Sequence, residues 1–267
     1  MEAATNSLKN VLVVGGAGGI GAACCASLAS NWTPIVADRD WQGAERVAAK
    51  TGGRAYRLDV ADVEQIDSAI DSIERECGDI DGMLFAAGVI PPVQGPQQTG
   101  IQTWDRIFEV NTRGAYAVSR AVALRMASRG RGSIVLLSSL AGVTVTPHLA
   151  YGPSKAALIN VAGALAVYFG RQGVRVNAVS PGPVRTPVIE ESYARGQRDP
   201  AVMARQTALG RVITPAEVAG PIAFLLSDAA SAVTGTNIVV DAGAMVSLGW
   251  NLFGGVEAVL DGLPSGT

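Results

Sequence analysis

The sequence is poor in the residues that build disulfide frameworks and metal centres. It has three cysteines and one histidine in 267 residues. Cys24 and Cys25 are adjacent among alanines, where we expect small buried side chains of a helix, and Cys77 stands far from both. No spacing fits a metal site or a disulfide framework, and this pattern is typical of a reducing compartment. We therefore expect a cytoplasmic protein without a resident metal.

Charge of one sign and long apolar runs are also missing. The formal net charge is −2, which gives no electrostatic reason to bind nucleic acid or an anionic membrane. No apolar run reaches the ~20 residues of a membrane-spanning helix. Residues Met1 to Ser7 lack the basic and apolar regions of a signal peptide. Apolar residues make up 48% of the chain, which is enough for a sizeable core.

The sequence does contain an alternation of short β-branched runs with helical stretches. Strands are predicted at 11–14, 34–37, 55–58, 82–86, 133–137, 174–179 and 237–240. Helices are predicted from a glycine-rich segment to Ala29 and at 45–50, 63–77, 103–128, 151–169 and 215–226. This order indicates a parallel sheet covered on both faces. We predict one doubly wound, Rossmann-type α/β domain over residues 1–267, with about seven strands and functional loops at their carboxyl ends.

Glycines are concentrated where the first predicted strand gives way to the first helix. The segment from Gly15 to Gly21 contains both Gly-x-Gly-x-x-Gly and Gly-x-x-x-Gly-x-Gly. A flexible turn is the alternative, but glycines between a strand and a helix let backbone N–H groups approach a diphosphate. The residues expected to hold a dinucleotide here are Gly15, Gly18, Gly19, Ile20 and Gly21.

Acidic residues follow the second and third predicted strands. Asp38 lies about twenty residues beyond the glycine loop, where a carboxylate accepts hydrogen bonds from ribose hydroxyls and repels a 2′-phosphate. This predicts NAD rather than NADP, although Arg39 could accommodate a phosphate, and Asp38 could also cap a helix. Asp59 and Val60 are candidates for the adenine edge, with a solvated turn as the alternative.

Tyr151 and Lys155 are four residues apart and therefore share one helix face. An ammonium beside a phenol favours the phenolate, so the pair can exchange a proton with an alcohol or a carbonyl oxygen. Two serines, Ser138 and Ser139, lie about a dozen residues upstream. The pair alone is weak evidence for a catalytic site, because Tyr-x-x-x-Lys also arises by chance on solvated helices.

Together these motifs resemble the short-chain dehydrogenase/reductase superfamily over nearly the full length of the chain. The matching segments are Gly15-x-x-x-Gly19-Ile20-Gly21, Ala86-Ala87-Gly88, Asn111, Ser138-Ser139-x-x-Gly142, Tyr151-x-x-x-Lys155, the run from Arg175 through Pro181, Gly182 and Val184 to Thr186, and Asp241-Ala-Gly243. Val14 and Ala86 depart from the family, which often has Thr and usually Asn at these places. We expect both departures to affect stability rather than chemistry.

The resemblance implies residue roles in hydride transfer. Tyr151 would be the general acid/base, and Lys155 would favour the phenolate and hold the nicotinamide ribose. Asn111 would hold a water that links Lys155 to solvent, and a serine would donate to the substrate oxygen. Ala86, Ala87, Gly88, Pro181, Gly182, Val184 and Thr186 would line the cofactor site, together with Asn111, Tyr151 and Lys155.

The identity of the serine stays open at this point. The family's usual spacing of thirteen residues before the tyrosine selects Ser138, whereas Ser-x-x-Gly selects Ser139. The intervening loop is one residue short near Pro147 and His148, and a loop deletion is easier than a change of strand register. We favour Ser139, with Ser138 as the alternate. His148 is a candidate substrate contact, with a surface residue as the alternative.

The predicted activity is an NAD-dependent oxidation or reduction between a secondary alcohol and a ketone. The alternatives are a 3-oxoacyl-thioester reductase, which Asp38 disfavours because biosynthetic reductions generally use NADPH, and a non-catalytic NAD-sensing or scaffold protein. The resemblance implies a substrate lid at residues 187–210, with a solvated helical insert as the alternative. The extension at about 247–267, with Trp250 and Phe253, is predicted to contact another subunit or to cap a neighbour's site. The resemblance implies a homodimer or homotetramer, with the Asn111 and Tyr151 helices at the main interface.

Overall fold

The computed structural model describes residues 8–196 and 199–262. The N-terminal residues 1–7 lie outside this part of the chain. The predicted lid is described except for residues 197–198, and the predicted C-terminal extension is described up to Gly262.

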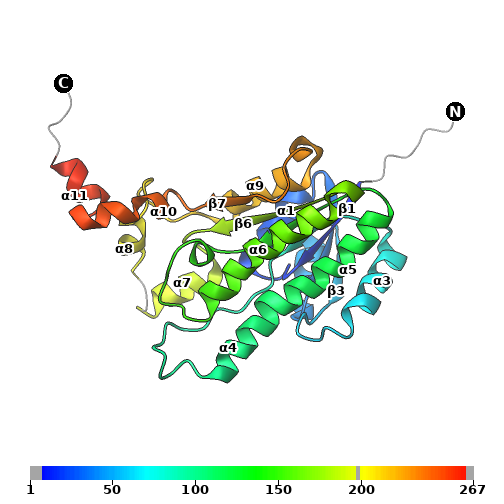
Figure 1. Ribbon diagram of the computed structural model, residues 1–267, viewed down its shortest axis with the longest axis horizontal. Coiled ribbons are helices and arrows are strands. Elements are labelled where there is room, and N and C mark those ends of the chain that lie inside the picture. The colour runs from blue at the N-terminus through cyan, green and yellow to red at the C-terminus, as the bar shows by residue number, and fades with distance from the viewer. Residues whose placement is uncertain (1–7, 197–198, 263–267) are drawn as a thin grey trace.

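A parallel sheet of seven strands forms the centre of the molecule (Figure 1). Its strands are β1 (Lys9–Val14), β2 (Trp32–Asp38), β3 (Arg54–Arg57), β4 (Ile80–Phe85), β5 (Gly132–Leu137), β6 (Val174–Pro181) and β7 (Asn237–Val240). They lie in the order β3-β2-β1-β4-β5-β6-β7, and every neighbouring pair is parallel. The strand order reverses between β1 and β4, which is where doubly wound sheets bind ligands. The predicted fold class is confirmed.

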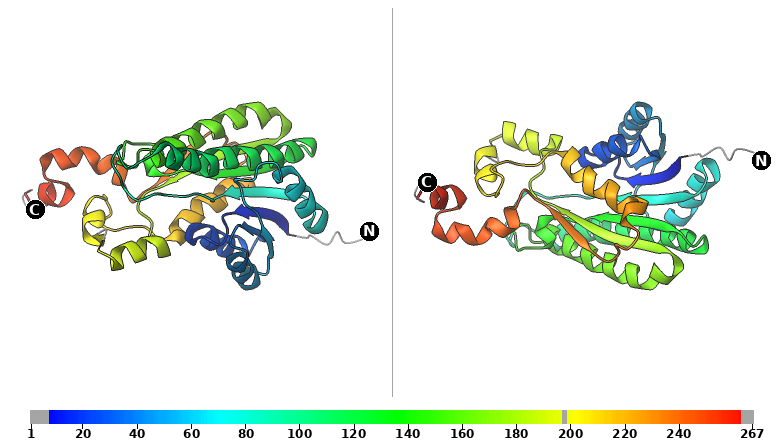
Figure 2. Two further views of the ribbon diagram at one scale, coloured as in Figure 1. Left: turned by 90° about the horizontal axis from the view of Figure 1, so that it is seen from below. Right: turned by 90° about the horizontal axis from the view of Figure 1, so that it is seen from above.

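Helices cover both faces of this sheet, as the two views of Figure 2 show. One face packs against α3 (Ile66–Cys77), α5 (Ala115–Ser128) and α6 (Tyr151–Phe169). The other face packs against α1 (Gly19–Leu28), α2 (Trp41–Thr51) and α9 (Pro215–Leu226). Cys24 and Cys25 are buried in this second layer, as predicted, and burial raises the pKa of each thiol to about 12.

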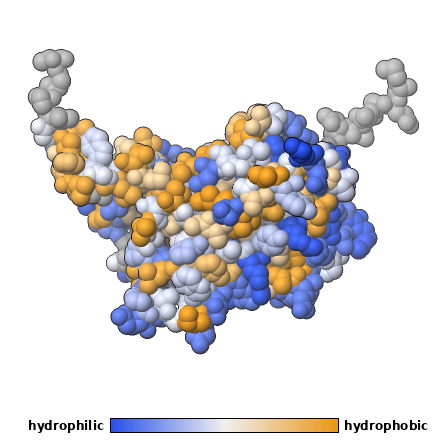
Figure 3. Space-filling model, viewed as in Figure 1, coloured by the Kyte–Doolittle hydropathy of each residue, from blue (hydrophilic) through white to orange (hydrophobic). Residues whose placement is uncertain are grey.

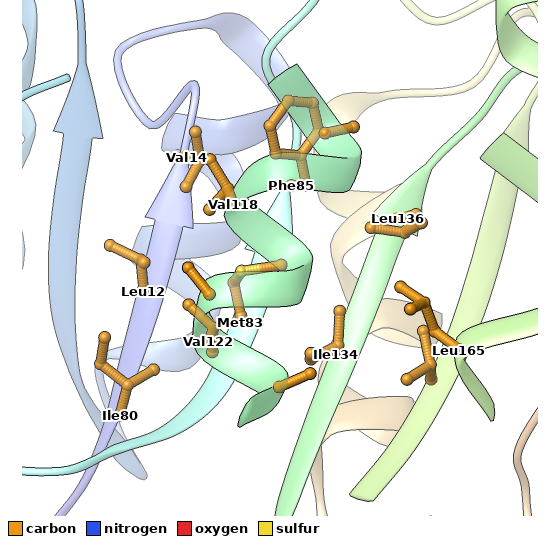
Figure 4. Packing of buried hydrophobic residues seen from close by; sticks show 14 of the residues in the cluster. Leu12, Val14, Ile80, Met83, Phe85, Val118, Val122, Ile134, Leu136 and Leu165 are labelled. Carbon is orange, nitrogen blue, oxygen red and sulfur yellow. The ribbon is translucent and has the colours of Figure 1, made fainter. Parts of the chain in front are cut away.

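Alternating side chains of the strands fill the two cores. Leu12 and Val14 of β1 face α5 and α6, whereas Val11 and Val13 face the opposite layer. Figure 4 shows the first core, in which residues of β1, β4 and β5 meet the apolar faces of these helices. Fully burying an aliphatic or aromatic side chain such as Phe85 contributes ~1.5–3 kcal/mol. The two cores hold the carboxyl ends of the strands in place.

The predicted helix at 103–128 is interrupted at the position of Asn111. The structure has α4 (Ile101–Phe108), a π-helical segment, η1 (Glu109–Gly114), and then α5. A Cβ at Gly114 would lie 2.6 Å from the carbonyl oxygen of Val60, so the helix approaches the loop after β3 closely. Such π segments are frequent at functional sites. Periodicity did not reveal the interruption, because a single inserted residue leaves the apolar spacing on both sides intact.

The predicted helix at 63–77 begins later, at Ile66, because residues 62–65 form turns. Asp62 donates its backbone N–H to the carbonyl oxygen of Asp59, and Gln65 donates to that of Asp62. Val63 still packs against the core. The partly buried, apolar Val63 therefore fits the helical spacing of the sequence, although it lies before the first residue of the helix.

The C-terminal segment leaves the body beyond α7 (Pro187–Ala194) and α8 (Pro200–Arg205), the helices of the predicted lid, as Figure 1 shows. It comprises α10 (Ala244–Ser247), η5 (Leu248–Phe253) and α11 (Val256–Asp261). Apolar side chains gather along it in Figure 3. Those exposed to solvent are Val246, Leu248, Trp250, Leu252, Phe253 and Leu260. No helix in the described part of the chain has the length and apolarity to cross a membrane.

Candidate active site

A cavity of about 460 Å³ lies at the carboxyl ends of the strands, on both sides of the switch point. Its lining combines residues of the glycine loop with residues that follow β2, β3 and β4. The lining residues are Val14, Gly15, Ala17, Gly18, Asp38, Arg39, Asp40, Leu58, Asp59, Val60, Ala86, Ala87, Gly88, Val89, Val110 and Val188. Loops distant in the sequence therefore meet at the place that the fold favours for a ligand.

Gly15 and Gly21 allow close backbone contacts within the glycine loop, whereas Gly18 leaves space on the cavity side of the loop. Gly15 has φ +81°, and a Cβ there would lie 2.4 Å from the backbone nitrogen of Ala87. A Cβ at Gly21 would lie 2.2 Å from the carbonyl oxygen of Gly15. A Cβ at Gly18 would meet nothing closer than 3.4 Å, so the protein itself does not require glycine there. Gly18 lines the cavity and begins α1 without a side-chain cap. The first N–H groups of α1 therefore suit an anionic ligand such as a diphosphate.

Asp38 ties the glycine loop to β2. Its carboxylate accepts hydrogen bonds from the backbone N–H of Ala17, at 3.0 Å, and from that of Asp40, at 2.9 Å. The helix cap considered for Asp38 belongs instead to Asp40, which accepts from the backbone N–H of Gly43 at 3.0 Å. An ionised carboxylate has about four acceptor positions, so Asp38 can still accept ribose hydroxyls from the cavity.

The predicted adenine-edge residues also lie at the cavity. Asp59 accepts a hydrogen bond from the backbone N–H of Ala61 at 3.0 Å, which fixes the turn that carries Asp59 and Val60. Arg39 and Asp40 line the same region, so one cation and three carboxylates, those of Asp38, Asp40 and Asp59, meet there. This balance of charge is unfavourable for an added phosphate.

Some predicted cofactor residues do not line this cavity. They are Gly19, Ile20, Gly21, Asn111, Tyr151, Lys155, Pro181, Gly182, Val184 and Thr186. Gly19 packs against the segment that follows β6, because a Cβ there would lie 2.9 Å from Cδ of Pro187 and 3.1 Å from Cβ of Thr186. Val184 pairs with Ile213 in an isolated bridge. The segment after β6 therefore runs past the start of α1.

Other lining residues had no role in the sequence prediction: Ala17, Asp40, Leu58, Val89, Val110 and Val188. Ala17, Leu58 and Val89 flank predicted residues, so proximity in the chain was the available signal. Val188 belongs to α7 and reaches the cavity because the segment after β6 packs against the glycine loop at Gly19. Nothing in its local sequence indicates that contact.

Lys155 lies in the second turn of α6, and its side chain is buried. Its ammonium donates a hydrogen bond to the carbonyl oxygen of Leu137 at 2.8 Å and lies 5.7 Å from the ring centroid of Tyr151. Burial lowers the pKa of Lys155 from 10.5 to about 8. The helical spacing of the pair thus brings the ammonium and the phenol ring together, as predicted.

The two serines have different surroundings. The buried Ser138 donates its hydroxyl to the carbonyl oxygen of Lys155 at 2.7 Å, which fastens β5 to α6. Ser139 caps η2 (Leu140–Gly142) and accepts from the backbone N–H of Ala141 at 3.2 Å. A hydroxyl that accepts in this way keeps its own proton for another acceptor. The hydroxyl of Ser138 is therefore used as a donor within the protein, whereas that of Ser139 can still donate.

The fully buried Asn111 connects the loop after β4 to α6. Its Oδ1 accepts from the backbone N–H of Val89 at 2.8 Å, and its Nδ2 donates to the carbonyl oxygen of Val89 at 3.0 Å and to Oγ of Ser154 at 3.1 Å. Ser154 in turn donates to the carbonyl oxygen of Tyr151 at 2.7 Å. Both amide protons are thus used within the protein. A water near Asn111 would bind the remaining lone pair of Oδ1 or the main chain.

His148 lies against the predicted acid/base. Its ring contacts Tyr151 edge to face, with the centroids 5.9 Å apart. The loop that carries it packs on the start of α6, because a Cβ at Gly142 would lie 2.7 Å from the backbone of Lys155. Among the described residues, no group of three or more His, Cys, Asp or Glu side chains is placed to hold a metal ion.

The lowered pKa of Lys155 predicts a pH effect on stability. In the folded protein Lys155 loses its proton near pH 8, whereas an unfolded lysine does so near 10.5. Between these values the unfolded state binds more protons, so Lys155 makes the free energy of unfolding rise with pH by up to ~1.4 kcal/mol per unit. Urea unfolding of wild type and Lys155→Met at pH 8, 9 and 10 measures this.

The comparison with the variant matters because other groups act in the opposite direction. Burial raises the pKa values of Cys24 and Cys25, so their contribution to stability is lost above about pH 9. We expect the difference in unfolding free energy, wild type minus Lys155→Met, to increase from pH 8 to pH 10. A difference that stays constant would contradict the proposed titration of Lys155.

Comparison with known proteins gives consistent results. Residues 15–245 match the sequence model of a family described as enoyl-(acyl carrier protein) reductase. The chain is 36% identical over 242 residues to D-threitol dehydrogenase of Mycolicibacterium smegmatis, covering 88% of this chain and 92% of that protein. It is also 36% identical over 242 residues to cyclopentanol dehydrogenase of Comamonas sp., covering 88% and 96%. A solved structure described as ElxO with NADP bound superposes with a TM-score of 0.85 at 25% identity, covering 90% and 100%.

Proposed function

Because the chain belongs to the short-chain dehydrogenase/reductase superfamily, we propose that it is an NAD-dependent oxidoreductase that interconverts a secondary alcohol and a ketone. The observation that carries this proposal is the placement of Lys155 and Tyr151 together, next to a nucleotide-sized cavity whose lining residue Gly88 approaches the ammonium of Lys155. The dehydrogenase relatives act on alcohols by their names, which supports the reaction class.

The cofactor would lie from the cavity to the Tyr151–Lys155 pair. The residues that would hold it are those of the glycine loop, Asp38, the Ala86–Gly88 segment and the segment from Pro181 to Thr186. When bound, the nicotinamide ring exchanges a hydride with the carbinol carbon. Three carboxylates against one guanidinium in the cavity support NAD over NADP. The choice between the two cofactors is part of the proposal.

The protein's own groups would move the proton and polarise the oxygen. In the oxidation, Tyr151 accepts the hydroxyl proton as the carbinol hydrogen leaves with its electron pair. Lys155, in its protonated form, stabilises the phenolate that accepts this proton. Ser139 donates a hydrogen bond to the substrate oxygen, where charge develops in the transition state. Asn111 holds α6 and the loop after β4 in register through Ser154 and Val89.

The two serines give a matched pair of variants. We expect Ser139→Ala to lower kcat by about a hundredfold or more, because it removes the donor to the developing oxyanion. Ser138→Ala removes a buried bond to the backbone of Lys155, so we expect mainly a loss of stability of about 1 kcal/mol. Steady-state rates and urea unfolding of both variants separate these effects. A larger loss of kcat in Ser138→Ala would reverse the assignment.

Two other functions have weaker support. A 3-oxoacyl-thioester reductase shares an acyl-thioester substrate, but not the reduced bond, with the enoyl reductase that describes the matching family, and Asp38 and its neighbours disfavour the NADPH that such reductions generally use. A non-catalytic NAD sensor would not need Tyr151, Lys155 and a serine with an available proton together. Absence of turnover despite NAD binding would favour the sensor.

We also propose a homodimer or homotetramer in the cytoplasm. Tyr116 and Leu124 of α5 and Val167 and Tyr168 of α6 are exposed, which supports contact of these helices with a second subunit. The apolar C-terminal segment supports a further subunit contact. Sedimentation of the full chain measures the state of assembly.

The test of the proposed function is an assay with NAD(H) and NADP(H) in parallel. Secondary alcohols or ketones are supplied, and the absorbance band of the reduced nicotinamide is followed. We expect turnover to be much faster with NAD(H) than with NADP(H). Preference for NADP(H) would contradict the cofactor assignment, and no turnover with either would contradict the reaction.

A further inference from the structure

Two loops that reach the acid/base pair lack fixed charge altogether. One follows β4, and no ionisable side chain occurs in residues 82–104, between Asp81 and Asp105. The other follows β5, and in residues 132–154, between Arg131 and Lys155, the only titratable side chains are His148 and Tyr151. By contrast, the cavity at the nucleotide end has four charged residues. The charge of the site is therefore concentrated where the cofactor would bind.

Contacts within the structure place both loops at the acid/base pair. Val89 is held by Asn111, and a Cβ at Gly88 would lie 3.4 Å from Nζ of Lys155. A Cβ at Gly152, one residue after Tyr151, would lie 3.0 Å from the carbonyl oxygen of Ala141 and 3.7 Å from Oγ1 of Thr146. Together with the edge contact of His148, these approaches bring both loops to the start of α6.

The parts of the loops near the sheet present apolar side chains to solvent. After β4 the chain reads Val-Ile-Pro-Pro-Val, and Ile90 and Val93 are 44% and 54% exposed. After β5, Val143, Val145 and Leu149 are 39%, 97% and 42% exposed. Apolar side chains on these loops gain free energy when a hydrocarbon covers them. Hydroxyls of a polyol that face these apolar side chains would lose hydrogen bonds to water and gain none from them.

Two arginines at the predicted lid are already in ion pairs. Arg185 forms an ion pair with Glu190, and Arg195 with Glu191 at 3.2 Å. Arg185 lies just before the predicted lid, and the other three residues lie within it. An anionic substrate would have to displace a glutamate to use either of these two arginines.

We propose that the substrate is an uncharged alcohol or ketone whose skeleton beside the reacting carbon is hydrocarbon, such as a small alicyclic ring, rather than an anion or a polyol. This inference rests on the proposed hydride transfer at Tyr151. It goes further, because the family's reaction by itself does not specify what surrounds the carbinol carbon.

The test compares three alcohols with NAD⁺ in the full-length protein: cyclohexanol, its 4-carboxylate analogue and a four-carbon polyol. We expect kcat/KM for cyclohexanol to exceed that of both others by about a hundredfold, since a carboxylate would meet no counter-ion in these loops and extra hydroxyls would lose hydrogen bonds to water against the apolar side chains. A preference for the carboxylate analogue or the polyol would overturn the inference while leaving the hydride transfer intact. No turnover with any of the three would overturn the proposed function, and the inference with it.

A variant that adds a charge to the loop after β5 tests whether this loop faces the substrate. Val143→Lys should raise the ratio of kcat/KM for the carboxylate analogue to that for cyclohexanol by about tenfold, because the ammonium supplies the missing counter-ion. Leu8→Lys, at the amino end of β1 and opposite the site, is the matched control and should leave the ratio unchanged. Equal ratios in both variants would contradict the placement of the loop at the substrate.

A binding measurement gives a readout without turnover. Calorimetric titration of the NAD⁺ complex of Tyr151→Phe with cyclohexanol should show binding with a negative heat-capacity change, the signature of apolar burial. The polyol should bind more weakly by about tenfold or more. Tighter binding of the polyol would overturn the inference independently of the rates.

Discussion

Tyr151→Phe is expected to lower kcat by about 10²–10⁴-fold, the usual contribution of a general acid/base. The variant keeps the ring that packs against His148 and lies near Lys155 but loses the hydroxyl. NAD binding should change little, because the cavity proposed for its adenosine end does not include Tyr151. Steady-state rates and calorimetric titration with NAD⁺ measure the two effects separately.

A matched control lies on the same helix. Tyr168 of α6 is 70% exposed, so Tyr168→Phe makes the same chemical change away from the site. We expect its kcat to equal that of the wild type. Tyr151→Phe with full activity, or equal losses in the two variants, would remove Tyr151 from the proposed chemistry.

Asp38→Asn is expected to lower the ratio of kcat/KM for NAD⁺ to that for NADP⁺ by about a hundredfold, equivalent to about 2.7 kcal/mol. The Asp38 carboxylate would face the 2′-phosphate of NADP⁺ at short range, and like charges placed together cost several kcal/mol. The substitution removes this repulsion and leaves Arg39 beside the phosphate. Rates must be compared at one ionic strength, because salt screens the interaction.

Asp40→Asn provides the control for this prediction. Asn caps a helix about as well as Asp, so α2 should keep its stability. The change removes one cavity carboxylate but not the one that joins β2 to the glycine loop. We expect a change in the cofactor ratio of about tenfold or less. Equal changes in both variants would show that Asp38 has no special part in choosing the cofactor.

Much of this molecule follows from local sequence physics. The strands could be predicted because a parallel sheet buries both faces, which makes runs such as Val11–Val14 continuously apolar. The glycine loop could be predicted because Gly15 needs a positive φ and Gly21 leaves no room for a Cβ. The approach of Tyr151 to Lys155 follows from helical spacing.

Features that depend on contacts between distant segments could not be predicted. The π segment contains Asn111, whose amide bonds to Val89 and Ser154 join parts of the chain far apart in the sequence. Val188 reaches the cavity because the segment after β6 packs against the glycine loop. The distinction between Ser138 and Ser139 also required tertiary structure, because the bond from Ser138 to the carbonyl of Lys155 spans seventeen residues of chain.

The central claim is that this site transfers a hydride from a carbinol carbon to a nicotinamide. Incubation with NAD⁺ and cyclohexanol deuterated at its carbinol carbon, followed by mass spectrometry and NMR of the nucleotide, tests it most directly. We predict one deuterium at C4 of the nicotinamide for each ketone formed, in a single stereochemical position and without exchange with water. Ketone formed without deuterium in the nucleotide would contradict the claim.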